Sequence, residues 1–280
     1  MTYVKMGARP LDYEPCSYGE SRLLFRGPAR DLTGEYVAFL GGTETYGKFL
    51  PRPFPHLVEE KLGVTCVNFG QVNAGVDAYL GDSAVIEAAS GAALTVVQVM
   101  GANNLSNRFY TVHPRRNDRF LRASQLMQSV FREVDFTEFH FTRHMLGALA
   151  QRAPKRFATV IAEIQSAWLA RMALLLGRIG SDTVLLWFGD HPPPTQCPMS
   201  AAQTDPFAVE RSMIEKLRPH VATVIELTAH PAALASETAE MVFTALEAPA
   251  AHAMLGPAAH EAVALRLADA LRGRLGRRSH

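Results

Sequence analysis

Four short stretches of this sequence combine glycine with polar side chains, and each of them follows or closes a run of apolar residues. A hydroxyl, a histidine and side-chain amides occur among them, and these are the groups that acyl-ester chemistry needs. A hydroxyl attacks the carbonyl, a histidine takes its proton, and amide N–H groups stabilise the oxyanion. The stretches are Gly41-Gly42-Thr43-Glu44-Thr45, residues 68–75 (NFGQVNAG), Gly101-Ala102-Asn103-Asn104 and Gly189-Asp190-His191.

The first stretch does not fit a nucleotide site. GGTETYGK, residues 41–48, lacks the spacing of a phosphate-binding P-loop, and its lysine is not followed by serine or threonine. No GxGxxG opens a helix after the first apolar run. The glycines therefore indicate close backbone approach at a site of another kind.

Five apolar runs supply the elements that must position these residues. Each is short and nearly continuous in apolar character, which is typical of strands buried on both faces of a parallel sheet. Helical patterns lie between them, at residues 53–63, 76–91 and 155–179, and a last one follows at 257–276. We predict a three-layer α/β/α doubly wound sheet of about five parallel strands, whose carboxyl ends meet at one rim. The runs are residues 35–42, 64–70, 94–101, 183–189 and 221–228.

The composition limits the classes of partner. The chain has 280 residues, 48% of them hydrophobic, and a formal net charge of +1. That charge gives no bulk attraction to nucleic acid or anionic lipid, so we expect a small-molecule ligand and neither a nucleic-acid nor a membrane partner. The sequence is compatible with a homo-oligomer. Cys16, Cys66 and Cys197 show no CxxC spacing, and neither a signal peptide nor a membrane-spanning run is evident, so we expect a cytoplasmic protein.

The predicted organisation is an irregular N-terminal arm at residues 1–35 and a single α/β domain at 36–280. This domain carries an arginine-rich insert at about 104–152, in which arginines alternate with aromatic residues. Such a cluster suits either an anionic group or surface pairing with Glu133, Asp135 and Glu138. Arg108 is the candidate for ligand binding, because it is the member closest to Asn103 in the sequence.

A metal site is not predicted. His140 and His144 are four residues apart, as a pair of helical metal ligands would be, but the glutamate of HExxH and a third ligand are missing. We expect no cofactor.

The order of the polar stretches resembles that of the SGNH (GDSL-like) hydrolase family, over residues 36–275. That family's first block is Gly-Asp-Ser with a nucleophilic serine, and Gly41-Gly42-Thr43 stands there. The resemblance therefore implies that Thr43 is the nucleophile, and it implies the strand order 2-1-3-4-5. Gly70 matches the glycine whose N–H serves the oxyanion hole.

The remaining blocks of the family also have counterparts. Gly101-Ala102-Asn103 matches Gly-x-Asn, which implies that the Asn103 amide is a second oxyanion donor, and Asn104 stands where the family usually has aspartate. His252 is the nearest match to the catalytic histidine. The family's aspartate three residues before that histidine is replaced by Pro249.

Other residues could complete the site. Glu247 lies close to His252 in the sequence and could orient it, and Glu44 could contact a ligand. Asp190 and His191 form a second candidate pair, which could equally be a capping aspartate and a half-exposed histidine before a proline turn.

Two functions follow from these residues. One is an acyl-ester hydrolase or acyltransferase that acts on a small or carbohydrate-linked substrate with an anionic group. In it, Thr43 attacks, activated by His252 or by His191, while Gly42, Gly70 and Asn103 bind the oxyanion. The alternative is a non-catalytic protein that binds a small anionic or carbohydrate ligand at the same rim.

Overall fold

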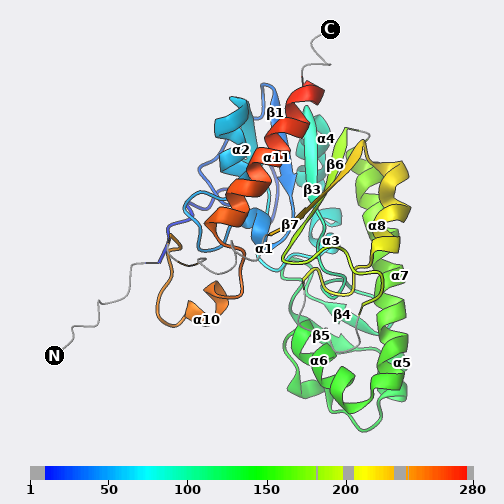
Figure 1. Ribbon diagram of the computed structural model, residues 1–280. Coiled ribbons are helices and arrows are strands. Elements are labelled where there is room, and N and C mark those ends of the chain that lie inside the picture. The colour runs from blue at the N-terminus through cyan, green and yellow to red at the C-terminus, as the bar shows by residue number, and fades with distance from the viewer. Residues whose placement is uncertain (1–9, 181, 198–204, 230–237, 239, 276–280) are drawn as a thin grey trace, which may run out of the picture.

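A parallel sheet forms the centre of the protein (Figure 1). The computed structural model describes residues 10–180, 182–197, 205–229, 238 and 240–275. Within these residues the sheet has five strands in the order β2-β1-β3-β6-β7, all parallel, and each lies inside one of the predicted apolar runs. Numbered within the sheet alone, the order is 2-1-3-4-5, so the predicted fold class is confirmed. The strands are β1 (Tyr36–Leu40), β2 (Thr65–Asn68), β3 (Leu94–Gln98), β6 (Thr183–Gly189) and β7 (Thr223–Thr228).

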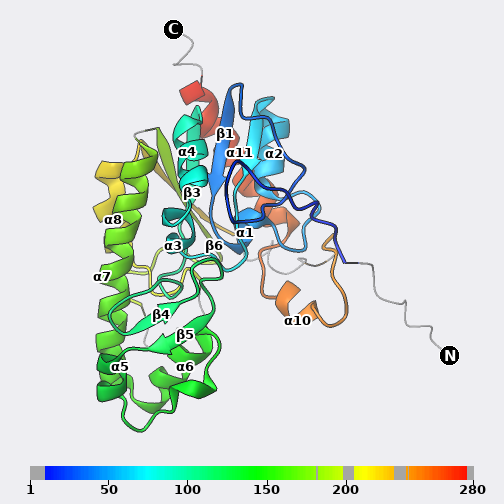
Figure 2. The same cartoon turned by 180° about the vertical axis from the view of Figure 1, so that it is seen from behind.

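Helices cover both faces of the sheet (Figure 1, and from behind Figure 2). One face carries α2 (Phe54–Leu62) and α11 (Pro257–Leu275), which pack against each other. The other face carries α3 (Val76–Leu80), α4 (Ser83–Gly91), α7 (Pro154–Ile179) and α8 (Arg211–Leu217). Two separate hydrophobic cores result, one on each side of the sheet.

Residues 76–91 form two helices rather than the single one predicted. The break falls at Gly81 and Asp82, because the Asp82 carboxylate accepts the backbone N–H of Val85 and starts α4 as its N-cap. The same carboxylate accepts the hydroxyl of Ser21 at 2.8 Å, which ties the N-terminal arm to this corner.

Helix α7 is long, at 26 residues, and buries one face in the core. The Trp168 indole N–H donates to the carbonyl of Met100 at 2.9 Å, beside the end of β3. By length and composition alone this helix could cross a bilayer, contrary to the prediction, although a long core helix passes the same test.

The arginine-rich insert folds as a small lobe beside α7, at the end of the molecule opposite the last residues of α11 (Figure 1). Its hairpin and helices share the core of the α7 face of the sheet. Helix α6 (Thr142–Arg152) begins after His140, so His140 and His144 do not share a helix face, contrary to the prediction. The elements are β4 (Tyr110–Val112), β5 (Phe120–Ala123), α5 (Gln125–Val130), the 3₁₀ turn η1 (Phe136–Glu138) and α6 (Thr142–Arg152).

The described part of the N-terminal arm, residues 10–35, lies along the β2 edge and over the loop after α1 (Thr43–Tyr46). The Arg26 guanidinium donates to the carbonyls of Gly47, Leu50 and Pro51 at 2.7–2.8 Å. Residues 1–9 of the predicted arm lie outside the described residues.

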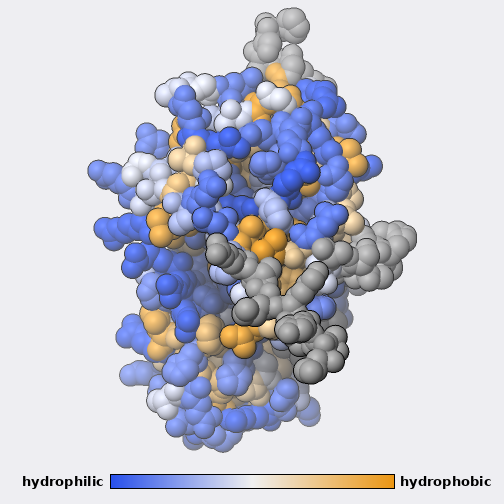
Figure 3. Space-filling view, turned by 90° about the vertical axis from the view of Figure 1, so that its left-hand side faces the viewer, coloured by the Kyte–Doolittle hydropathy of each residue, from blue (hydrophilic) through white to orange (hydrophobic). Residues whose placement is uncertain are grey.

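Seen from the side of the arm and α10 (Ala248–Ala251), the surface is largely hydrophilic with small separate apolar patches (Figure 3). A short turn, η2 (Arg218–His220), follows α8.

Candidate functional site

A cleft of about 830 Å³ lies at the carboxyl ends of β1, β3 and β6. Its walls come from the rim of the sheet, from the insert lobe and from the segment that precedes α11. The fold therefore brings together most of the residues singled out in the sequence, as expected for the strand ends of a doubly wound sheet. The predicted residues that line it are Gly42, Thr43, Glu44, Asn103, Asn104, Asp190 and His252.

The turn between β1 and α1 is held by Gln98, at the end of β3. The Gln98 Oε1 atom accepts the Thr45 hydroxyl at 2.5 Å and the N–H groups of Gly42 and Thr45, each at 3.2 Å. It thus satisfies N–H groups of the first turn of α1, as a capping side chain would. Gly41 is required here, because a Cβ would lie 2.1 Å from the Thr45 hydroxyl. Since the Gly42 N–H is bonded to Gln98, the structure gives no support to the predicted oxyanion role of Gly42.

The Thr43 hydroxyl is held by Asn73. The backbone N–H of Asn73 donates to Thr43 Oγ1 at 3.0 Å, and the hydroxyl donates back to Asn73 Oδ1 at 3.3 Å. Asn73 has a φ of +56°, a left-handed conformation that asparagine tolerates better than most residues. Its own amide donates to Asp118 of the insert lobe at 3.3 Å. Asn73 thus links the nucleophile candidate to the lobe.

Gly70 does not take the place predicted for it. Its N–H donates to Asn68 Oδ1 at 2.8 Å, and Gly70 does not line the cleft. A Cβ at this position would lie 2.3 Å from the backbone nitrogen of Tyr46, so the glycine permits close packing of two loops. The backbone donor next to Thr43 is that of Asn73, three residues further on.

Asn103 and Asn104 are buried at the inner wall of the cleft. The Asn103 amide donates to Asn104 Oδ1 at 2.7 Å and to the Thr142 hydroxyl at 3.3 Å. Asn104 in turn donates to the carbonyl of Asn73 at 2.9 Å. The amides thus form a network that fixes the inner wall, and the Asn103 amide is bonded within it rather than open to an oxyanion.

His252 lines the cleft on the segment between α10 and α11. Its Nδ1 lies 2.6 Å from the carbonyl of Ala248, so Nδ1 carries the proton and Nε2 is the acceptor. Glu247 does not orient it. The Glu247 carboxylate accepts the N–H and the hydroxyl of Thr244, which lower its pKa. The His252 Nδ1–H therefore donates to a backbone carbonyl, whereas the catalytic histidine of a serine hydrolase donates to a carboxylate.

The second candidate pair is not assembled. Asp190 lines the cleft, but His191 does not. The His191 ring packs edge-on against Trp187, and its Nδ1 lies 2.9 Å from the carbonyl of Pro192. Its Nε2 is 3.8 Å from Asp190 Oδ1, beyond hydrogen-bond distance.

Arg108 is not at the cleft, contrary to the prediction. Its guanidinium donates to the Glu163 carboxylate of α7, with an Nε–Oε2 distance of 2.7 Å, and its backbone N–H donates to the same carboxylate. The guanidinium lowers the pKa of Glu163, which is buried. Arg108 therefore joins the insert lobe to α7.

Replacing Arg108 with alanine should lower the urea midpoint of unfolding without changing ligand binding at the cleft. Because Glu163 has a lowered pKa in the folded state, the pair stabilises the fold above the ordinary glutamate pKa, and this contribution is lost as the pH falls through the folded-state pKa. The difference between variant and parent should shrink accordingly in urea titrations at decreasing pH. Arg115→Ala, at an exposed arginine of the same lobe, is the control and should show no such loss.

Several cleft residues were missed in the sequence. Gln98 could have been found, because it is the one side-chain amide in the apolar run 94–101. Asn73 lies in the polar stretch 68–75, in which Gly70 was the residue given a role. Carboxylates outnumber guanidinium groups in the cleft lining. The lining includes the carboxylates of Glu44, Asp118, Asp190 and Asp205 and the guanidinium of Arg143, which pairs with Asp205. In the part of the chain that the structure describes, no three His, Cys, Asp or Glu side chains are grouped as metal ligands would be.

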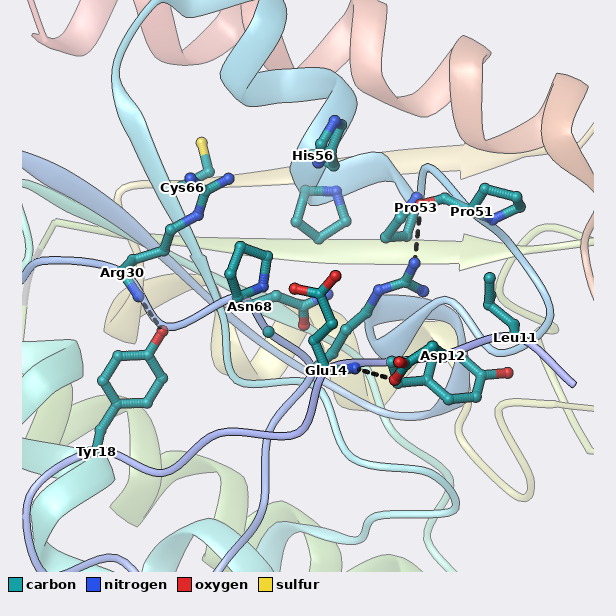
Figure 4. Close-up of a pocket in the computed structure, with 15 residues that line it drawn as sticks. Leu11, Asp12, Glu14, Tyr18, Arg30, Pro51, Pro53, His56, Cys66 and Asn68 are labelled. Atoms are coloured by element: carbon teal, nitrogen blue, oxygen red, sulfur yellow. Dashed lines mark hydrogen bonds between the residues drawn. The ribbon is translucent and has the colours of Figure 1, made fainter.

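A second pocket, of about 210 Å³, lies between the N-terminal arm and α2 (Figure 4). The Tyr18 hydroxyl accepts the Arg30 N–H at 2.9 Å, and burial raises the pKa of Tyr18 to about 12. Burial also raises the pKa of the Cys66 thiol, which disfavours a reactive thiolate. This pocket therefore offers no activated nucleophile.

The sheet order and the cleft define a doubly wound α/β protein with a polar site at its strand ends. The chain belongs to the family described as "Domain of unknown function (DUF6473)", whose model matches residues 1–275. A search of curated proteins gave no match.

The solved structures that are similar to this chain include the following two. A lipase/acylhydrolase from Enterococcus faecalis is 13% identical, with a TM-score of 0.43, covering 86% of this chain and 97% of that one. The lipase Lip_vut3 from a goat rumen metagenome is 11% identical, with a TM-score of 0.41, covering 86% and 100%. Scores this low carry no argument about the site, and the fold class above rests on the strand pairing itself.

Proposed function

We propose that the cleft performs acyl-ester chemistry, hydrolysis or acyl transfer, with Thr43 as nucleophile and His252 as base. The observation that carries this proposal is that Thr43 and His252 line the same cleft, with the Asn73 N–H 3.0 Å from the Thr43 oxygen. A hydroxyl, an acceptor nitrogen and a backbone donor in one cleft are the parts that acyl transfer requires.

The reaction would run in two steps. In the first step the Thr43 hydroxyl turns from Asn73 Oδ1 to His252 Nε2, and Oγ1 attacks the acyl carbon as its proton passes to that nitrogen. The Asn73 N–H, which donates to Oγ1 in the free protein, shifts to the tetrahedral oxyanion. His252 then protonates the leaving alcohol as the carbon–oxygen bond breaks, which leaves an acyl-threonine. Water releases the acyl group in hydrolysis, and an acceptor hydroxyl releases it in transfer. The Ala248 carbonyl is neutral, so it stabilises the imidazolium less than a carboxylate would, and turnover should be slow.

The charge of the lining supports a neutral, polar substrate rather than the anionic one expected from the sequence. Carboxylates outnumber arginines in the cleft, and Arg108 is engaged with Glu163. An anionic group would be repelled by this wall. Side-chain amides and carboxylates are suitable partners for sugar hydroxyls. We therefore propose a carbohydrate-linked ester as the substrate class.

A second candidate function is binding without chemistry. It is favoured by the bonding of Thr43, whose hydroxyl exchanges both of its hydrogen bonds with Asn73, and by the carbonyl partner of His252. Such a protein would bind a carbohydrate in the cleft and leave its ester bonds intact. Ligand affinity would then be unchanged by removal of the Thr43 hydroxyl.

The test is a pair of substitutions at Thr43, measured by hydrolysis of p-nitrophenyl acetate. Thr43→Ala should lower kcat by at least about 10³-fold, because the attacking atom is gone. Thr43→Ser should match or exceed the parent, because it retains the hydroxyl and removes the methyl that crowds the attack. Equal turnover by Thr43→Ala and the parent would refute Thr43 as the nucleophile.

A further inference from the structure

We propose that Glu44 is a positioning residue that, together with His260, fixes the segment carrying His252 against the helix carrying Thr43. Glu44 directly follows Thr43 at the start of α1, and His260 lies in the first turn of α11. The inference rests on the proposed function, because it assigns the device that sets the nucleophile–base geometry.

His260 has a defined tautomer. The backbone N–H of Phe54 donates to His260 Nδ1 at 3.1 Å, so Nδ1 is an acceptor and the proton is on Nε2. His260 Nε2 lies 3.2 Å from Glu44 Oε2, so this N–H donates to the carboxylate. The His260 side chain is 0% exposed and that of Glu44 is 18% exposed. His260 is thus buried and does not line the cleft, and its Nε2–H donates to the Glu44 carboxylate, which does.

Glu44 also contacts the segment before α11. The N–H of Leu255 lies 3.4 Å from Glu44 Oε1, so the two carboxylate oxygens accept donors on either side of the start of α11. Leu255 is three residues after His252. The carboxylate therefore connects the chain that bears the base directly to the turn that bears the nucleophile.

Both short helices need such a connection. Helix α1 and helix α10 have four residues each, too few to be stable by their own hydrogen bonds. A reacting pair must be held at a defined distance, and a misplacement of about 1 Å costs about 10²-fold in rate. The Glu44–His260 bond supplies that restraint from a fully buried ring.

The first experiment is hydrogen–deuterium exchange of the peptide covering residues 248–256, which needs no substrate. Glu44→Ala should raise exchange in this peptide at least severalfold, while exchange in β3 and β6 stays as in the parent. Glu60→Ala, which removes an exposed carboxylate of α2 away from the cleft, is the matched control and should change nothing there. Unchanged exchange in Glu44→Ala would overturn the proposal.

The second experiment measures kcat and KM for p-nitrophenyl acetate. Glu44→Ala should lower kcat by about 10²-fold with KM unchanged. Glu44→Gln should recover most of this loss, because the amide oxygen still accepts the His260 N–H. A glutamine variant as slow as the alanine variant would show instead that the charge of Glu44 acts in the reaction, and a raised KM would show that it binds substrate. Either result overturns the positioning role.

The two proposals fail separately. If the parent has no esterase activity but Glu44→Ala loosens residues 248–256, the acyl-ester proposal fails and the positioning role stands. If Thr43→Ala abolishes activity but Glu44→Ala exchanges like the parent, the positioning role fails alone. His260→Leu is a second variant, because leucine offers neither the acceptor for the Phe54 N–H nor the donor to Glu44, and it should loosen the same peptide.

Discussion

Replacing His252 with asparagine should lower kcat for p-nitrophenyl acetate by about 10²–10⁴-fold, the range that a general base contributes. Asparagine can still donate an amide N–H to the Ala248 carbonyl, so the segment keeps its hydrogen bond. It has no basic nitrogen at the position of Nε2, so the Thr43 proton has no acceptor. The loss should therefore appear in kcat, with the fold intact by circular dichroism.

The matched control for His252 is His140→Asn, because His140 is exposed and does not line the cleft. That variant should keep the activity of the parent. If His191→Asn, rather than His252→Asn, abolished activity, the base would be the other candidate, and the conformation of the Trp187–His191 turn would have to change on substrate binding.

Replacing Gln98 with leucine should lower the free energy of unfolding by about 2–4 kcal/mol, because it leaves several donors without an acceptor. Those donors are the N–H groups of Gly42 and Thr45 and the Thr45 hydroxyl, and Thr45 is fully buried. Leucine has a similar size, so lost packing contributes little. Because the same donors build the turn before Thr43, kcat should fall as well.

Gln98→Glu distinguishes the loss of the hydrogen-bond acceptor from the loss of side-chain packing. The carboxylate supplies an acceptor at the same position, so the turn should keep its hydrogen bonds and most of its stability. Both variants are measured by urea unfolding followed by tryptophan fluorescence. Equal stability of Gln98→Leu and the parent would contradict the role given to the Gln98 oxygen.

The sheet could be predicted because each of its strands lies in a short, nearly continuous run of apolar residues. Buried parallel strands are apolar on both faces, and β1, β3 and β6 are buried along their whole lengths. The lobe could not be predicted in the same way. Its strands have three and four residues, too short for a periodic pattern, and the core that they share with α7 is not visible locally.

The residues of the cleft were predictable as a set, but their partners were not. A strand-end rule places Thr43 and Asn103 at one rim without saying which atoms bond. Those bonds join distant parts of the chain: Gln98 reaches Gly42 across 56 residues, and Phe54 reaches His260 across 206. Arg108 illustrates the converse, because its closeness to Asn103 in the sequence does not bring its side chain to the cleft.

The backbone donor beside Thr43 is Asn73 and not the predicted Gly70, and the left-handed conformation of Asn73 accounts for this difference. Gly70 was expected there because it matches the glycine of the SGNH family whose N–H serves the oxyanion hole. Here the left-handed residue is an asparagine, and its side chain adds a contact to Thr43 that glycine could not make. The glycine itself serves packing against Tyr46.

The most direct test of Thr43 as an activated nucleophile is covalent labelling with a fluorophosphonate probe, followed by mass spectrometry of the intact protein and of its peptides. A nucleophilic hydroxyl that is activated by a histidine forms a stable adduct with such a probe. We expect one adduct, located on Thr43, which is absent in Thr43→Ala and forms far more slowly in His252→Asn. An unlabelled parent protein, or an adduct that persists in Thr43→Ala, would contradict it.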